Sequence, residues 1–228
     1  MRRVFHIAAL WPEVEALAEQ GLVAFAFTGS NAYVAPAGGT RALYGTNPMA
    51  FAWPRPDRPP LVFDQASSAA ARGEIQIRKR EGETLPPGWA IGPDGEPTTD
   101  PATALAGAQL PFGGHKGAAI ALMIELLAGA LIGDLFSYEA READTHGVGA
   151  PLGGEFLIAL DPASCVGPDE RAQQLERAEQ LFSHILAQDG TRLPGERRHA
   201  ERQRTPVEGV DVARAVYDDV IALRDGSA

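Results

Sequence analysis

The sequence contains very little cysteine, since Cys165 is the only one in 228 residues. A single cysteine excludes an internal disulfide framework and a thiolate-rich metal site. Such sparse use of cysteine is typical of proteins from a reducing compartment. We therefore expect a cytoplasmic protein.

Positive charge is scarce as well. Lysine and arginine together number 20, against 30 aspartates and glutamates, so the net charge is −10 and the isoelectric point is about 5.0. Nucleic acid is itself negatively charged, and a chain of this composition repels it unless a local basic patch overcomes the overall field. We predict no nucleic-acid partner.

A long hydrophobic run is also absent. The most apolar stretch, residues 118–133, contains Glu125 and is shorter than the roughly 20 residues of a membrane-spanning helix. The few residues before Trp11-Pro12 do not contain the apolar run of a secretory signal. We expect no membrane partner. Because residues 118–133 are apolar nearly all round, we expect them to form a central, buried helix.

The signatures of the common nucleotide and metal sites are missing. No G-x-G-x-x-G segment follows a strand-like run, and no G-x-x-x-x-G-K-[ST] segment occurs. The histidines do not show a metal-ligand spacing such as H-E-x-x-H, so we predict no bound metal. If a dinucleotide binds to this chain, the fold that holds it is not the common Rossmann fold.

Strand-like and helix-like segments alternate along the chain, which indicates an α/β protein with a central sheet. Neither an internal repeat nor a low-complexity linker interrupts them, so we expect residues 1–228 to belong to one domain. Residues 81–114 are rich in Gly, Pro, Thr and Asp and predict a long loop with a functional role. Strands are expected at 22–27, 49–53, 61–63 and 153–161, and helices at 11–20, 118–133, 170–188 and 210–224.

A glycine-rich turn, Gly113-Gly114, leads into the apolar helix and is followed by Lys116. Such a turn leaves unpaired backbone N–H groups at the positive end of the helix dipole, and the lysine adds a point charge. The pattern is compatible with a phosphate or carboxylate site. A tight turn beside a solvated lysine accounts for the same residues.

Three arginines, Arg192, Arg197 and Arg198, crowd a turn that contains Pro194-Gly195. Planar guanidinium groups form bidentate hydrogen bonds with phosphate, so this turn is a candidate clamp for a ribose 2′-phosphate. Taken in isolation, such a cluster is more often a solvated basic loop.

Asp64, Arg72 and Glu74 lie within one short stretch. An arginine near a carboxylate is usually part of a surface ion pair of little consequence. In the alternative, Arg72 binds a substrate carboxylate while an acid orients a catalytic group. Because Asp64 directly follows the strand-like run 61–63, we also expect it to contact a ligand at the end of that strand.

Several short motifs occur in a fixed order along the chain. They are Gly45-Thr46-Asn47-Pro48-Met49-Ala50-Phe51, Phe63-Asp64-Gln65-Ala66-Ser67-Ser68, Leu85-Pro86-Pro87-Gly88-Trp89-Ala90, Pro97-Thr98-Thr99-Asp100-Pro101, Pro111-Phe112-Gly113-Gly114-His115-Lys116-Gly117 and Leu193-Pro194-Gly195-Glu196. In this order they resemble the malate/L-lactate dehydrogenase family, which is unrelated to the Rossmann dehydrogenases. The resemblance extends over nearly the whole chain and implies the α/β fold of that family.

Residues 6–15 and Arg72-Gly73-Glu74 are similar to one branch of the family, the Δ1-piperideine-2-carboxylate/Δ1-pyrroline-2-carboxylate reductases. The resemblance implies a homodimer that binds NADPH and transfers a hydride to the C=N carbon of a small cyclic imino acid, giving L-pipecolate or L-proline. One alternative is an NAD(P)-dependent 2-hydroxy-acid dehydrogenase of the malate, lactate or ureidoglycolate type. The other is a catalytically inactive nucleotide-binding fragment.

The resemblance also assigns roles to individual residues. Thr46, Arg72 and Gly73 match substrate contacts. Glu74 falls at the acidic position of a Ser-His-acid relay, where the family usually has Asp, and His6 is a second candidate proton carrier, so these two are the candidate catalytic residues. The residues that match dinucleotide contacts are His6, Ile7, Ala8, Ala9, Leu10, Asp64, Gln65, Ala66, His115, Lys116, Thr191, Arg192, Leu193, Pro194, Gly195, Glu196 and Arg197.

Members of the family begin with a helical segment of roughly a hundred residues, which carries a Ser-His pair and a substrate-binding Arg. In this chain Met1 stands five positions before His6. We therefore expect the chain to lack that segment and its proton donor, and to turn over poorly by itself.

Overall fold

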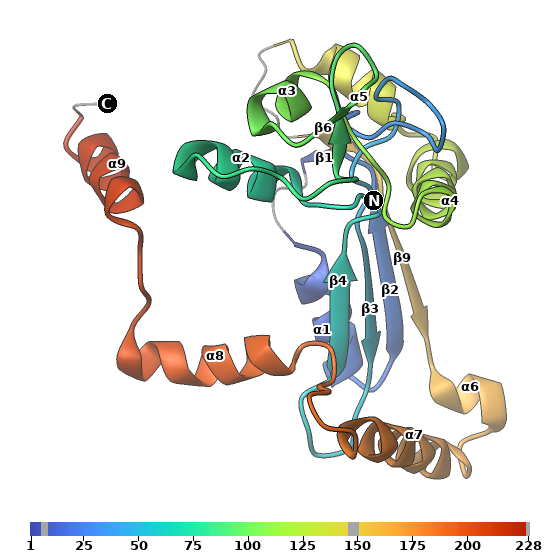
Figure 1. The fold of residues 1–228 in the computed structure, drawn as a ribbon. Helices are drawn as coiled ribbons and strands as arrows, with labels where there is room; N and C mark the ends of the chain where they lie inside the picture. Colours follow the sequence, from blue (N-terminus) through green and yellow to red (C-terminus); the bar gives the residue numbers. More distant parts are fainter. Residues whose placement is uncertain (6–8, 146–150, 227–228) are drawn as a thin grey trace.

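The computed structural model describes residues 1–5, 9–145 and 151–226 (Figure 1). A four-stranded antiparallel sheet with the strand order β4-β3-β2-β9 lies at its centre. The expected strands are confirmed, with shifts of one or two residues at their ends. They are β2 (Val23–Thr28), β3 (Met49–Trp53), β4 (Leu61–Gln65) and β9 (Glu155–Leu160).

One face of this sheet is built from small side chains. The alanines of β2 and β3 point to this face and are fully buried, because helix α1 (Trp11–Glu19) packs on them through Val14 and Ala18. Alanine lets a helix come close to the strands, so a short helix can cover this face. The alanines concerned are Ala24, Ala26, Ala50 and Ala52.

The opposite face carries large side chains, because side chains alternate between the two faces of a strand. Helix α4 (His115–Ile124) continues as a π-helix, η1 (Glu125–Leu131), and packs on one end of this face against Phe27. Helix α7 (Arg171–Leu186) packs on the other end through Phe182. The sheet therefore lies between α1 on one side and α4, η1 and α7 on the other (Figure 1).

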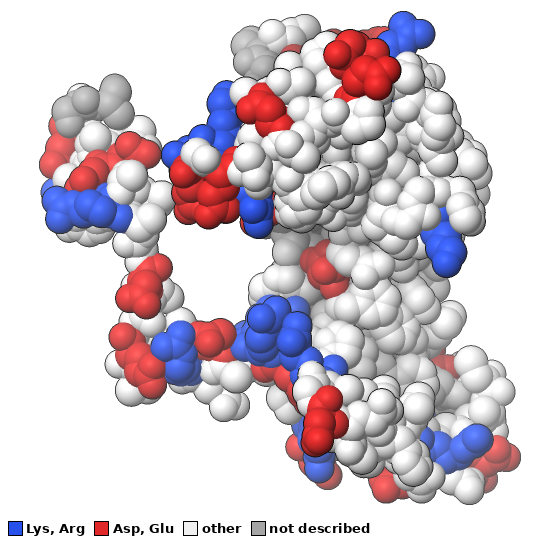
Figure 2. All heavy atoms as spheres, in the orientation of Figure 1, with Lys and Arg blue, Asp and Glu red and all other residues white. Residues whose placement is uncertain are grey.

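The apolar helix is buried only on the side that faces the sheet, which corrects the expectation of a helix buried all round. Leu122 and Met123 are exposed, as are Leu126 at 51% and Leu131 at 64%. The reason is that one sheet covers one side of a helix, and no described element covers the other. The surface around α4 is accordingly mostly uncharged (right side of Figure 2).

Residues 81–114 are not the long loop that their composition predicts. They contain β5 (Ala90–Ile91), β6 (Pro97–Thr98), α3 (Pro101–Ala106) and β7 (Ala108–Gln109), and the three strands form a second sheet. This sheet and α2 (Arg72–Glu81) enclose a small core around Ile75 and Ala104. Strands of two residues are too short to show a hydrophobic period, which is why the sequence pattern misses them.

The remaining elements lie around this framework. Helices α8 and α9 extend away from the central sheet (Figure 1), and α8 begins inside the segment that the sequence predicts as a turn. Among the described residues, no helix has both the length and the apolar character that crossing a membrane requires. The other elements are β1 (Val4–Phe5), α5 (Ser137–Ala143), β8 (Leu152–Gly153), α6 (Pro162–Val166), α8 (Glu196–Glu208) and α9 (Arg214–Arg224).

Candidate functional site

A surface pocket of about 540 Å³ lies where β4 ends, between α1 and the start of α8. We call it the arginine pocket, because three arginines line it. Basic side chains gather at this place, where α8 leaves the body of the molecule (Figure 2). The residues that line it are Ala9, Trp11, Val62, Phe63, Asp64, Gln65, Ala66, Arg192, Pro194, Gly195, Arg197 and Arg198.

Asp64 joins the end of β4 to the start of α1. Its Oδ2 accepts the backbone N–H groups of Leu10 at 2.7 Å and of Trp11 at 2.9 Å. The first N–H groups of a helix have no partner within the helix, and a carboxylate is a favourable acceptor for them. In the described part of the chain the second oxygen, Oδ1, accepts no hydrogen bond. Asp64 thus anchors the start of the helix through Oδ2, and it lines the arginine pocket.

Gly195 places the arginine-rich turn directly on β4. Its φ is +88°, and a Cβ atom at this position would lie 3.0 Å from the carbonyl oxygen of Val62. A side chain would therefore be strained by the backbone conformation and would also press on the strand. Only glycine lets the turn come this close to β4.

Other residues of the same turn hold it in place. Leu193 is buried against Leu61 and Phe182, and its N–H donates to Oε2 of Glu196 at 3.0 Å. The hydroxyl of Thr191 donates to the carbonyl of Gln188 at 2.8 Å. Thr191, Leu193 and Glu196, which the sequence suggests as dinucleotide contacts, therefore shape the turn and do not line the arginine pocket.

A buried carboxylate fixes one wall of the pocket. Glu15 is 4% exposed and forms ion pairs with Arg202 at 2.8 Å and with Arg198 at 3.3 Å. The two guanidinium groups lie 5.0 Å and 4.5 Å from the centre of the Trp11 ring. Burial opposes the ionisation of Glu15, but the two arginines outweigh it and hold the pKa of this carboxyl below its ordinary value of 4.5.

Arg192 and Arg197 differ from Arg198 in that neither forms an ion pair with an acidic residue in the described ranges. Two guanidinium groups without a carboxylate partner thus border an open pocket. Guanidinium groups bind phosphate through parallel hydrogen bonds, so this arrangement suits a phosphorylated ligand.

Three further described residues that the sequence predicts as dinucleotide contacts, Leu10, His115 and Lys116, do not line the arginine pocket. Leu10 is fully buried, and only its backbone takes part near the pocket. His115 and Lys116 are exposed in the first turn of α4 and do not line the arginine pocket. Three predicted contacts, His6, Ile7 and Ala8, lie outside the described residues.

Thr46, a predicted substrate contact, lies next to the end of β4. Its carbonyl oxygen accepts the N–H of Ser67 at 2.8 Å and the hydroxyl of Ser67 at 2.9 Å. Its own N–H donates to the hydroxyl oxygen of Ser30 at 2.9 Å. Ser67 directly follows Ala66, which lines the arginine pocket. Thr46 is therefore connected to the pocket through its hydrogen bonds with Ser67 and does not line it.

Arg72, Gly73 and Glu74 form the first turn of α2. The guanidinium of Arg72 lies 3.8 Å from the centre of the Tyr33 ring, and burial lowers the pKa of this arginine. The side chain of Glu74 is 42% exposed and pairs with Arg78 at 3.0 Å, one turn further along the helix. The described contacts of Glu74 are thus those of a surface ion pair, and none of these three residues lines the arginine pocket.

A buried polar network, which the sequence patterns do not predict, holds the residue that follows Thr46. Asn47 donates to Oε1 of Glu125 at 2.8 Å, and Oε2 of Glu125 accepts the N–H of Ser137 at 2.9 Å. The hydroxyl of Ser137 donates to Oδ1 of Asn47 at 3.1 Å, which closes the network. Asn47 has a φ of +36°, a conformation that asparagine tolerates better than most residues. The local signal for it in the sequence is an asparagine between Gly45-Thr46 and Pro48.

This chain belongs to the malate/L-lactate dehydrogenase family, whose model matches residues 1–221. It is 52% identical to a Delta(1)-pyrroline-2-carboxylate reductase from Ancylobacter novellus, over 96% of this chain and 64% of the relative. It is 53% identical to a Delta(1)-pyrroline-2-carboxylate/Delta(1)-piperideine-2-carboxylate reductase from Pseudomonas aeruginosa, over 98% of this chain and 66% of the relative.

Solved structures show the same similarity. The crystal structure of delta1-piperideine-2-carboxylate reductase from Pseudomonas syringae matches with a TM-score of 0.84 and 45% identity, over 96% of this chain and 65% of that chain. A putative malate/lactate dehydrogenase from E. coli matches with a TM-score of 0.80 and 31% identity, over 94% of this chain and 61% of that chain. The expected fold class is therefore confirmed. This chain spans about two thirds of the length of the relatives that it matches.

Proposed function

We propose that this chain is the dinucleotide-binding and substrate-binding part of an NADPH-dependent reductase of cyclic imino acids, which forms L-proline or L-pipecolate from Δ1-pyrroline-2-carboxylate or Δ1-piperideine-2-carboxylate. The observation that carries the proposal is the arginine pocket, which brings together segments from three distant parts of the sequence. The names of the similar reductases indicate the class of substrate.

The residues of the arginine pocket fit a dinucleotide with a 2′-phosphate. Arg192 and Arg197 are suited to the phosphate, because their guanidinium groups have no acidic partner in the described part of the chain. Oδ1 of Asp64 is suited to accept a hydrogen bond from a ribose hydroxyl. Gly195 lines the pocket and keeps the arginine-rich turn close to β4. When bound, NADPH would supply the hydride for the carbon of the C=N bond.

The substrate requires two further contributions from the protein. We assign the carboxylate of the imino acid to Arg72, together with Thr46 and the backbone of Gly73, because a half-buried arginine remains charged and offers several donors. The imine nitrogen needs a proton. We assign Glu74 and His6 to this step, in which they either transfer the proton or orient the group that donates it. To take this role, Glu74 must give up its ion pair with Arg78 and contact the substrate or the proton donor instead.

We also propose a homodimer in the cytoplasm as the working form. The exposed apolar side chains of α4 and η1 support this assignment, because a second copy would remove them from water. Light scattering coupled to size-exclusion chromatography gives the mass in solution. A mass of one chain over a wide concentration range would contradict the dimer.

The test of the function is to titrate residues 1–228 with NADPH and with NADH and to follow tryptophan fluorescence, since Trp11 lines the arginine pocket. A Trp11→Phe variant serves as the control that assigns the signal. Oxidation of NADPH is then measured with Δ1-pyrroline-2-carboxylate, pyruvate and oxaloacetate. Preference for the cyclic imine supports the proposal. Preference for a 2-oxo acid indicates a hydroxy-acid dehydrogenase, and binding without any turnover indicates a nucleotide-binding fragment.

A further inference from the structure

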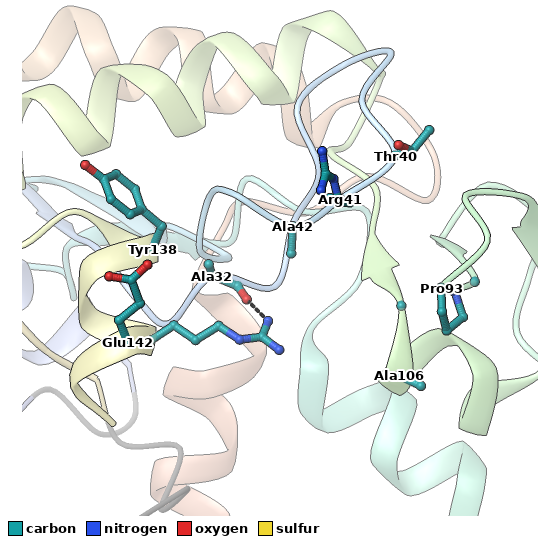
Figure 3. A pocket seen from close by; sticks show the side chains of 11 residues that line it. Ala32, Thr40, Arg41, Ala42, Pro93, Ala106, Tyr138 and Glu142 are labelled. Atoms are coloured by element: carbon teal, nitrogen blue, oxygen red, sulfur yellow. Dashed lines mark hydrogen bonds between the residues drawn. The ribbon is translucent and has the colours of Figure 1, made fainter. Parts of the chain in front are cut away.

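A second pocket, of about 600 Å³, lies apart from the arginine pocket and shares no lining residue with it. It is bordered by the loop 32–42, the end of β5, the end of α3 and helix α5 (Figure 3). Its charged lining residues are Arg41, Arg141 and Glu142. None of them belongs to the residues that the sequence singles out.

Arg141 reaches from α5 across this pocket. Its Nη1 donates to the carbonyl oxygen of Ala32 (dashed line in Figure 3), and its guanidinium lies 5.6 Å from the centre of the Tyr33 ring. Arg72 faces the same ring at 3.8 Å and donates to the carbonyl oxygen of Leu105 at 3.3 Å. Leu105 directly precedes residues that line the pocket. Two guanidinium groups from different helices thus contact one tyrosine ring. Arg141 lines the pocket, whereas Tyr33 and Arg72 do not line it but lie beside it, since Tyr33 follows the lining residue Ala32 and Arg72 bonds to Leu105 next to Ala106.

Both cations lack a negative partner within the described ranges. Neither Arg72 nor Arg141 forms an ion pair with an acidic side chain there, and the same holds for Arg41 at the pocket wall. Glu142 turns toward Tyr138 and away from the hydrogen bond of Arg141 (Figure 3). Burial, and to a smaller extent the charge of Arg141, lower the pKa of Arg72. The two positive charges therefore repel each other, and the one on Arg72 is partly removed from water.

A negative ligand would relieve this repulsion. A guanidinium group carries five N–H donors, and the described residues accept one hydrogen bond from each of these two arginines. The remaining donors suit a carboxylate, which accepts two parallel hydrogen bonds from one arginine and a further one from another. Glu142 at the outer wall disfavours a dianion such as phosphate more than a singly charged carboxylate.

We propose that the carboxylate of a small cyclic acid binds at the edge of this second pocket next to Tyr33, where Arg141 at the pocket wall and Arg72 beside it would be its two cations, so that Arg141 is a carboxylate-binding residue of the substrate site. The inference rests on the proposed function, because Arg72 is assigned there to the substrate. The inference adds Arg141 as a second cation for the substrate carboxylate and states where that carboxylate binds. Arg141 is exposed, so its replacement leaves the core of the protein unchanged.

The probe is pyrrole-2-carboxylate, a planar ring acid without a reducible C=N bond, and its binding to residues 1–228 is measured by calorimetry. We expect Arg141→Met to weaken binding by about 10- to 100-fold, since a charge-assisted contact is lost. Arg141→Lys keeps the charge and is expected to retain part of the affinity. Arg80→Met, on the exposed side of α2, is the matched control and is expected to bind like the wild type.

Three results would overturn the inference: equal affinity of wild type and Arg141→Met, equal affinity for pyrrole-2-carboxamide, and tighter binding of inorganic phosphate than of the carboxylate. The titration of NADPH in the same variants separates this inference from the proposed function, because the arginine pocket is a different place. Carboxylate binding without any NADPH binding would reject the cofactor assignment and leave the second pocket standing. NADPH binding together with unchanged carboxylate binding by Arg141→Met would overturn the inference about the second pocket and leave the cofactor assignment standing.

Discussion

Glu15 of α1 and Arg202 of α8 form an ion pair of 2.8 Å, although they lie 187 positions apart in the sequence. Together with Arg198, this pair holds the start of α8 against α1 and closes one wall of the arginine pocket. Most of α8 extends away from the sheet, so few other contacts can keep it there (Figure 1).

We expect Glu15→Gln to lower the free energy of unfolding by about 1.5–3 kcal/mol at neutral pH, because hydrogen bonds between charged groups are lost at a buried position. The pKa of Glu15 is lowered in the folded state, so its stabilisation is present above the ordinary value of 4.5 and is lost as the pH falls through the lowered value. Denaturant unfolding at several pH values checks this expectation. Glu208→Gln, which removes an exposed pair on the same helix, should change little. A difference between Glu15→Gln and the wild type that persists in strong acid would contradict the role of the charge.

Arg192→Ala and Arg197→Ala are each expected to weaken NADPH binding by about 1.5–3 kcal/mol and to leave NADH binding almost unchanged. The reason is that only NADPH carries the 2′-phosphate, and these guanidinium groups have no acidic partner among the residues that the structure describes. The measurement is the fluorescence titration with both cofactors. Arg177→Ala on α7, whose guanidinium contacts Gln174, is the control for a general loss of positive charge. Equal losses for the two cofactors would refute the assignment of the 2′-phosphate.

Asp64 has two separable roles that two substitutions can distinguish. Asp64→Asn keeps an oxygen for the N–H groups of Leu10 and Trp11, so the protein should stay folded but bind NADPH more weakly. Asp64→Ala removes the acceptor as well and should lower stability by about 0.5–2 kcal/mol. Thermal unfolding and NADPH titration are measured on both variants. Unchanged NADPH binding by Asp64→Asn would limit Asp64 to anchoring the helix.

Gly195→Ala tests whether the close approach of the turn to β4 matters. Both Gly195 and Gly190 have a positive φ, of +88° and +77°, so replacement by alanine strains each of them by about 1–2 kcal/mol. Only at Gly195 would the new Cβ press on the carbonyl of Val62, since nothing lies within 4 Å of the corresponding position at Gly190. We therefore expect Gly195→Ala to be the more destabilising of the two and to weaken NADPH binding, whereas Gly190→Ala leaves binding intact. Equal effects of the two substitutions on binding would show that the contact with Val62 is irrelevant.

Local patterns along the chain predict the main elements of this fold well. The short apolar runs at β2 and β3 and the longer apolar run at residues 118–133 place the central sheet and its long helix. The same patterns fail for residues 81–114, because strands of two residues are held by their neighbours in the sheet and not by a period of their own.

The sequence by itself determined the fold class, the strands of the sheet and the arginine-rich turn as a candidate phosphate site, because these follow from short-range periodicity, turn residues and charge. Only the tertiary structure decided which residues meet. It placed Asp64 under the start of α1, paired Glu15 with Arg202, and separated Glu74 and Lys116 from the arginine pocket. It also brought Arg141 of α5 and Arg72 of α2 to the same tyrosine ring. Such contacts join residues tens to nearly two hundred positions apart, and their geometry depends on how the helices pack on the sheet, which no local pattern encodes.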